Sequence, residues 1–209
     1  MIKKDINYSV YLVTDHRDKT DEEFLNIIGE AIKGGTTVVQ LREKTASTKD
    51  FYDLALKVKE ITSKYDVPLL INDRIDIAIA VDSEGVHIGQ DDMPADIARR
   101  IIGEDKILGV SASTVEEAKK AEADGADYIG SGAVFPTATK DDADSVSKEE
   151  LKEIVDSIDI PVVAIGGITL ENADTLKDTG IAGFSVVSAI MNAEDPKDAS
   201  KKLREIYFS

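Results

Sequence analysis

Eight short apolar runs alternate with amphipathic stretches along the chain, and this alternation limits the possible folds more than any other sequence feature. The runs cover residues 10–13, 38–41, 69–71, 86–88, 107–110, 128–129, 162–165 and 184–187. Short runs rich in Val and Ile, apolar at consecutive positions, are typical of strands buried on both faces of a parallel sheet. The pattern therefore predicts eight parallel strands separated by helices.

The segments between the runs carry helix signals. Apolar stripes at helical spacing are Phe51, Leu54, Ala55, Val58 and Ile61, and then Leu151, Ile154, Val155 and Ile158. Capping-box spacing, which predicts a helix start, occurs at Thr20/Glu23, Thr114/Glu117 and Ser147/Glu150. Gly34, Gly35, Gly125 and Gly180 stand where helices should end, and Pro68 and Pro161 where strands should begin.

The fold class that fits this order is the TIM (β/α)8 barrel, as a single catalytic domain over residues 1–209. An open doubly wound sheet also alternates strands and helices. The number of units and the lack of a G-x-G-x-x-G motif after the first run favour the barrel.

Composition limits the possible binding partners and the expected cellular location. A formal net charge of −16 disfavours binding to nucleic acid or anionic membranes, so we expect small-molecule ligands. No run is long enough to span a bilayer, and the N-terminus lacks a signal-peptide pattern, so a cytoplasmic location is expected. The chain has no cysteine, which excludes disulfides and thiolate chemistry. A homo-oligomer is compatible with the sequence.

The active site of such a barrel lies at the carboxyl ends of the strands. The second run ends in the segment Gln40, Leu41, Arg42, Glu43 and Lys44. Strand alternation places the side chains of positions 40, 42 and 44 together, so two cations and an amide converge. The alternative is a solvated strand end with a charge pair. In so acidic a chain, the convergence favours anion binding.

Carboxylates follow the third and fourth runs, at Asp73 and at Asp91 and Asp92. Neighbouring strands lie about 4.8 Å apart, so one carboxylate from each could share a Mg²⁺ ion with substrate phosphates. Each residue could instead cap a helix, with Pro94 in the first turn of the fourth helix. Both interpretations stay open from these residues alone.

The later loops offer further ligand groups. Ser111 is placed to bond a ligand, whereas Thr114 is expected to cap a helix. The loop after the sixth run carries Thr137, Thr139 and Lys140, although it could be a flexible surface loop. Gly166–Gly167 and the small residues 187–190 follow the last two strands, the usual phosphate site of these barrels. Both histidines, His16 and His87, are expected to be structural.

Several segments together resemble the thiamine-phosphate synthase family, in order along essentially the whole chain. They are YLVTD at 11–15, QLREK at 40–44, ND at 72–73, HIGQDD at 87–92, GVS at 109–111, PTATK at 136–140, GGI at 166–168 and VSAI at 187–190. The QLREK and PTATK segments are the specific ones.

The resemblance implies a Mg²⁺-dependent transferase that joins a hydroxymethylpyrimidine diphosphate to a hydroxyethylthiazole phosphate. It assigns the pyrimidine diphosphate to Gln40, Leu41, Arg42, Glu43, Lys44, Asn72, Ser111 and Lys140. It assigns the thiazole phosphate to Thr137, Ala138, Thr139, Gly167, Val187 and Ser188, and Mg²⁺ to Asp73 and Asp92. Asp92 is preferred to Asp91 because the family pattern is Gly-Gln-x-Asp. Arg42, Lys44, Ser111 and Lys140 are the implied catalytic residues.

One departure and three alternatives accompany this resemblance. Ser113 stands where the family often has histidine, which puts the rate or substrate detail in doubt rather than the reaction class. A thiazole tautomerase would want that histidine and would not need two carboxylates. A catalytically silent phosphate-binding barrel would have lost part of the site. An amino-acid biosynthesis isomerase would not need the PTATK loop.

Overall fold

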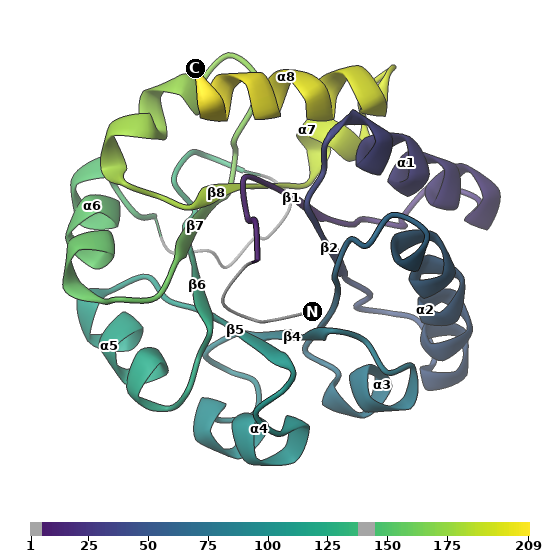
Figure 1. Cartoon of the computed structure of the whole chain (residues 1–209), viewed down its shortest axis with the longest axis horizontal. Helices are drawn as coiled ribbons and strands as arrows, with labels where there is room; N and C mark the ends of the chain where they lie inside the picture. The colour runs from purple at the N-terminus through teal and green to yellow at the C-terminus, as the bar shows by residue number, and fades with distance from the viewer. Residues whose placement is uncertain (1–5, 138–144) are drawn as a thin grey trace.

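Eight parallel strands form a closed barrel in chain order, with helices around the outside (Figure 1). The computed structural model describes residues 6–137 and 145–209. The strands are β1 Val10–Val13, β2 Val38–Leu41, β3 Leu69–Asn72, β4 Gly85–Ile88, β5 Ile107–Ser111, β6 Tyr128–Ser131, β7 Val162–Ile165 and β8 Gly183–Val186. Because β1 pairs with both β2 and β8, the predicted TIM barrel is confirmed and the open sheet is wrong.

The outer layer consists mainly of helices that follow the strands. They are α1 Asp21–Gly34, α2 Thr48–Ser63, α3 Ile75–Ala80, α4 Ala95–Ile102, α5 Val115–Ala123, α6 Lys148–Ser157, the 3-10 helix η2 Ala173–Thr179, α7 Ser188–Met191 and α8 Pro196–Phe208. The capping boxes at Thr20 and Ser147 are confirmed. The one at Thr114 forms only in part, because the Glu117 carboxylate accepts from the Ser113 amide at 2.7 Å instead.

Alternation along the strands separates two apolar layers. Val10, Leu12 and Leu41 belong to the larger layer between the strands and the helices. Tyr11 and Tyr128 belong to the smaller layer inside the barrel, together with Tyr8, Val13, Val38, Leu70, Ile107 and Val163. The strands therefore appear in sequence as continuous apolar runs, since both of their faces are covered.

A buried arginine ties the loops together at the amino-terminal end of the barrel. Arg99 of α4 donates to the carbonyls of Gly103, Lys106 and Gly125 and to Asp127 Oδ2, at 2.6, 2.7, 3.0 and 2.5 Å. The same carboxylate oxygen accepts from the Leu108 amide at 2.8 Å. One guanidinium thus fixes the segments that lead into β5 and β6.

Replacing this arginine should destabilise the barrel. We expect Arg99→Met to lower the free energy of unfolding by about 3 kcal/mol, because three carbonyls and a carboxylate lose a charged donor. The control is Arg100→Met, which removes the same charge from the exposed side of the same helix. Urea unfolding of both variants gives the measurement, and equal midpoints would contradict a structural role for Arg99.

Candidate active site

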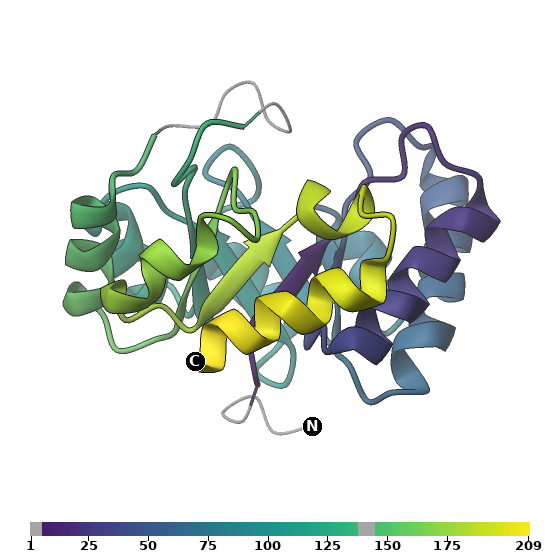
Figure 2. The ribbon, with the colours of Figure 1, turned by 90° about the horizontal axis from the view of Figure 1, so that it is seen from above.

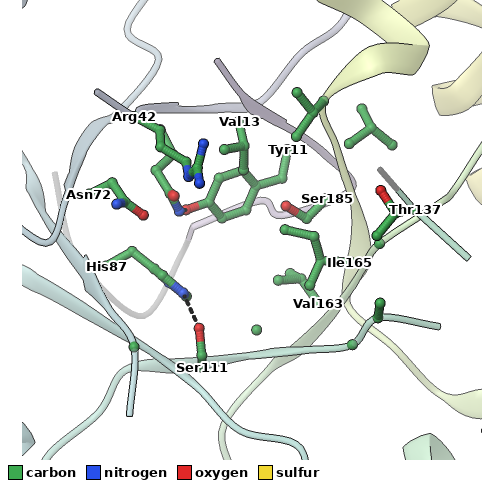
Figure 3. Close-up of a pocket in the computed structure, with 18 of the residues that line it drawn as sticks. Tyr11, Val13, Arg42, Asn72, His87, Ser111, Thr137, Val163, Ile165 and Ser185 are labelled. Atoms are coloured by element: carbon green, nitrogen blue, oxygen red, sulfur yellow. Dashed lines mark hydrogen bonds between the residues drawn. The ribbon is translucent and has the colours of Figure 1, made fainter. Parts of the chain in front are cut away.

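A cavity of about 400 Å³ opens at the carboxyl end of the barrel, within the usual range for small-molecule sites of roughly 300–1,000 Å³. Figure 2 shows the strands rising to this end, with the segment before β1 at the other end. Figure 3 shows the predicted residues Arg42, Asn72 and Ser111 reaching into the cavity from one side and Thr137 from the other. The cavity is therefore lined from two sides by groups that can hold two different parts of a ligand or two ligands.

The cations that follow β2 face the cavity as alternation predicts. Gln40, Arg42 and Lys44 line it, whereas Leu41 packs in the layer under the helices. Glu43 also points away, and its Oε1 lies 3.6 Å from His16 Nδ1. Burial is the main cause that raises the pKa of Glu43. The anion-binding side of the segment is thus positions 40, 42 and 44.

The two predicted metal carboxylates meet beside Lys44. Lys44 Nζ lies 2.5 Å from Asp73 Oδ2, and Asp92 Oδ2 accepts from the Gly89 amide at 2.7 Å. The pKa of Asp92 is raised, first by burial and further by its contact with Asp73, against the lowering effect of the Gly89 amide. Two charged carboxylates in contact repel each other, and Lys44 offsets that repulsion in this structure.

The helix-capping alternative for these carboxylates is wrong. Arg74 and Pro94 are the N-caps of α3 and α4, and neither helix start receives a side-chain cap. Pro94 therefore precedes α4 and does not lie in its first turn. No cluster of three or more His, Asp or Glu suited to a metal occurs in the described part of the chain. A pair of carboxylates nevertheless fits Mg²⁺, which completes its shell with waters and substrate phosphates.

The opposite side of the cavity is built from the glycine loop after β7. Gly166 and Gly167 have left-handed φ values of 97° and 65°. A Cβ on Gly166 would lie 2.5 Å from Ala133 Cα, and one on Gly167 would lie 2.5 Å from the Pro136 carbonyl oxygen. Glycine is thus required for the two loops to pack together, and this contact brings Thr137 to the cavity.

The loop after β8 completes this side. Val187 and Ser188 line the cavity, and Ser188 begins the short helix α7. The first amides of a helix have no partner within it and suit an anion. Ala138, Thr139 and Lys140, also expected here, lie outside the described residues.

His87 has a larger part in the site than the sequence indicates. Its ring lines the cavity, with Nε2 3.0 Å from Ser111 Oγ and Nδ1 2.8 Å from Tyr128 Oη. Gly109 and Gly130 leave room for these rings. A Cβ on Gly109 would lie 2.1 Å from Tyr128 Cζ, and one on Gly130 would lie 3.0 Å from His87 Cε1. Glycines inside strands were the available signal, since they mark a close approach of neighbouring groups.

Comparison with known proteins agrees with the fold and the cavity. The family model described as thiamine monophosphate synthase matches residues 10–190. Thiamine-phosphate synthase of Methanobrevibacter smithii is 68% identical over 95% of this chain and 94% of its own length. The Ruminiclostridium cellulolyticum enzyme of the same name is 57% identical over 100% of this chain and 99% of its own length.

A solved structure, thiamine phosphate pyrophosphorylase from Pyrococcus furiosus, superposes with a TM-score of 0.89. The two sequences are 41% identical, and the match covers 97% of this chain and 96% of the Pyrococcus furiosus chain. The fold and these relatives thus define a TIM-barrel transferase. The chain belongs to the thiamine monophosphate synthase family. Among the described residues, the helices are too short or too polar to cross a bilayer.

Alanine substitutions should distinguish two costs at the glycine loop: the strain of a left-handed backbone and the overlap with the neighbouring loop. Gly167→Ala should cost about 3 kcal/mol or more, because it adds an overlap with Pro136 to the strain of a left-handed alanine. Gly180→Ala is the control, since Gly180 is left-handed, with φ 81° and ψ 13°, and a Cβ there meets only the Val155 side chain, at 3.2 Å. We expect it to cost only about 1–2 kcal/mol. Equal losses in thermal unfolding would refute the contact.

Proposed function

We propose that the chain condenses 4-amino-2-methyl-5-(diphosphooxymethyl)pyrimidine with 4-methyl-5-(2-phosphooxyethyl)thiazole, giving thiamine phosphate and diphosphate. The observation that carries this proposal is one cavity with two unlike sides. One side gathers Arg42, Lys44 and a pair of carboxylates, and the other is a glycine loop with small residues. These sides suit a diphosphate and a monophosphate, respectively. Family membership supports the same reaction.

The carboxylates of Asp73 and Asp92 are the proposed holders of Mg²⁺. Their contact beside the cavity and the absence of any capping role support this assignment. Bound there, the ion would offset the negative charge that grows on the departing diphosphate. Lys44 pairs with Asp73 in this structure, so it must turn toward the diphosphate when a metal takes over the carboxylate.

The remaining assignments follow the family resemblance, and three of them, Ala138, Thr139 and Lys140, concern residues outside the described part of the chain. Arg42, Lys44 and Lys140 would stabilise the diphosphate as its bond to the pyrimidine methylene breaks, while Gln40, Asn72 and Ser111 orient the ring. Leu41 and Glu43 would act through their backbone, since their side chains point elsewhere. The thiazole phosphate would be bound by Thr137, Ala138, Thr139, Gly167, Val187 and Ser188.

This chemistry needs no protein nucleophile. The electron-rich aminopyrimidine supports positive charge at its methylene, and the thiazole nitrogen then attacks that carbon. The protein positions the two rings and supplies charge complementary to the leaving group. A buried amide such as Asn72 Nδ2, which has no hydrogen-bond partner among the described residues and lines the cavity, suits a ligand acceptor.

The direct test is product formation from the two substrates with and without Mg²⁺. We expect thiamine phosphate only with the metal, and a loss of about 100-fold or more in Asp92→Ala, because the leaving-group charge loses its main stabilisation. Asp91→Ala is the matched control, since it removes an adjacent exposed carboxylate and should cost far less. Folded wild-type protein that makes no product with any metal would rule out the synthase.

A further inference from the structure

A continuous chain of hydrogen bonds runs beneath the cavity and joins two of its polar walls. Gln40 Nε2 donates to Tyr11 Oη at 2.6 Å, and Tyr11 Oη lies 2.7 Å from Tyr128 Oη. Tyr128 Oη lies 2.8 Å from His87 Nδ1, and His87 Nε2 lies 3.0 Å from Ser111 Oγ. Four strands, β1, β2, β4 and β6, supply the first four members, and β5 supplies Ser111.

The two tyrosines in the middle of these hydrogen bonds are buried, although Tyr11 also lines the cavity. Tyr11 is 1% exposed and Tyr128 is 0% exposed, and the ring of Tyr8 lies 4.8 Å from that of Tyr128. Burial raises the pKa of both Tyr11 and Tyr128, so each hydroxyl keeps its proton. Tyr128 does not line the cavity and can act on a ligand only through its neighbours.

Counting protons gives this series of hydrogen bonds a direction. Tyr11 accepts from Gln40, so its single proton goes to Tyr128, whose own proton then goes to His87 Nδ1. The neutral imidazole must in that case carry its proton on Nε2 and donate to Ser111. The opposite direction would bring two donors to Tyr11 and leave its buried proton without a partner among the described residues, which is costly.

Both ends of the directed chain face the cavity. Ser111 receives a hydrogen bond from His87, so its own proton is available to a ligand. Gln40 uses its amide nitrogen on Tyr11, and its amide oxygen accepts no hydrogen bond from a described residue. The wall thus presents one donor and one acceptor. An aminopyrimidine whose amino group faces Gln40 and whose ring nitrogen faces Ser111 completes both hydrogen bonds. A 4-oxopyrimidine in the same orientation would set its carbonyl against the Gln40 oxygen and its ring N–H against the Ser111 proton.

We propose that Tyr128 is a positioning residue for substrate choice: through His87 it fixes Ser111 as a donor opposite the Gln40 acceptor, and so selects the aminopyrimidine over its 4-oxo counterpart. This inference rests on the proposed function, because it names the ring that the cavity distinguishes. Tyr128 does not touch the substrate in this arrangement, and its effect passes through the tautomer of His87.

The first test measures selectivity in matched variants. Dissociation constants for the 4-amino and 4-oxo pyrimidine diphosphates are measured by calorimetry without thiazole phosphate, so that reactivity does not enter. Tyr128→Phe should reduce the preference for the amino compound by about tenfold, the worth of one hydrogen bond. Tyr8→Phe removes a hydroxyl from the same aromatic cluster but not from the chain, and should keep the wild-type preference. An unchanged preference in Tyr128→Phe overturns the proposal.

The second test needs no variant at position 128. The chain has two histidines, so ¹⁵N-histidine NMR of the wild type resolves the tautomer of His87, with His16→Asn to assign the signals. A proton on Nε2 supports the directed chain, and a proton on Nδ1 overturns it. Wild-type protein that makes no thiamine phosphate would instead refute the proposed function. The NMR result would still test the direction of the hydrogen bonds.

Discussion

Closure of the parallel sheet is the constraint on which the rest of the structure depends. In a closed ring of strands, each register fixes which side chains face the interior and which face the helices. Tyr11 and Gln40 both face inward for this reason, and Arg42, two residues after Gln40 and just beyond β2, lines the cavity. Since all strands run the same way, their carboxyl ends bring polar residues from distant parts of the chain to one cavity.

Charge is distributed so that this cavity can bind anions in a strongly acidic protein. The net charge of −16 opposes phosphates at long range, but salt screens that field over roughly 8–10 Å. Within the cavity, Arg42 and Lys44 act at contact distance, and Asp73 holds Lys44 in place before a ligand binds. Asp73 also contacts Asp92. The charges at short range, rather than the net charge of the protein, therefore determine which ligands the site attracts.

Much of this arrangement could be predicted from the sequence, because strand burial and strand alternation are local properties. The run at 162–165 coincides with β7, and the one at 38–41 with β2. Alternation also placed the cations of the QLREK segment correctly. Where two local partners compete, the sequence did not decide between them. Glu117 bonds Ser113 rather than completing the box at Thr114, and Asp92 bonds Gly89 rather than capping α4. Spacing cannot distinguish such competing partners when both lie within reach.

The role of His87 could not be predicted from spacing, because its partners come from registers between strands far apart in sequence. Gly109 pairs with both His87 and Tyr128, so one glycine without a side chain lets two rings from its neighbouring strands meet. That contact also bears on the tautomerase alternative. A tautomerase needs an imidazole that exchanges protons with the thiazole, and position 113, where the family often has one, holds serine. His87 hydrogen-bonds Tyr128 and Ser111, from strands β6 and β5, so it does not take the place of an imidazole at position 113. The serine at position 113 therefore favours a synthase, whose chemistry requires placement and charge instead of an acid–base pair.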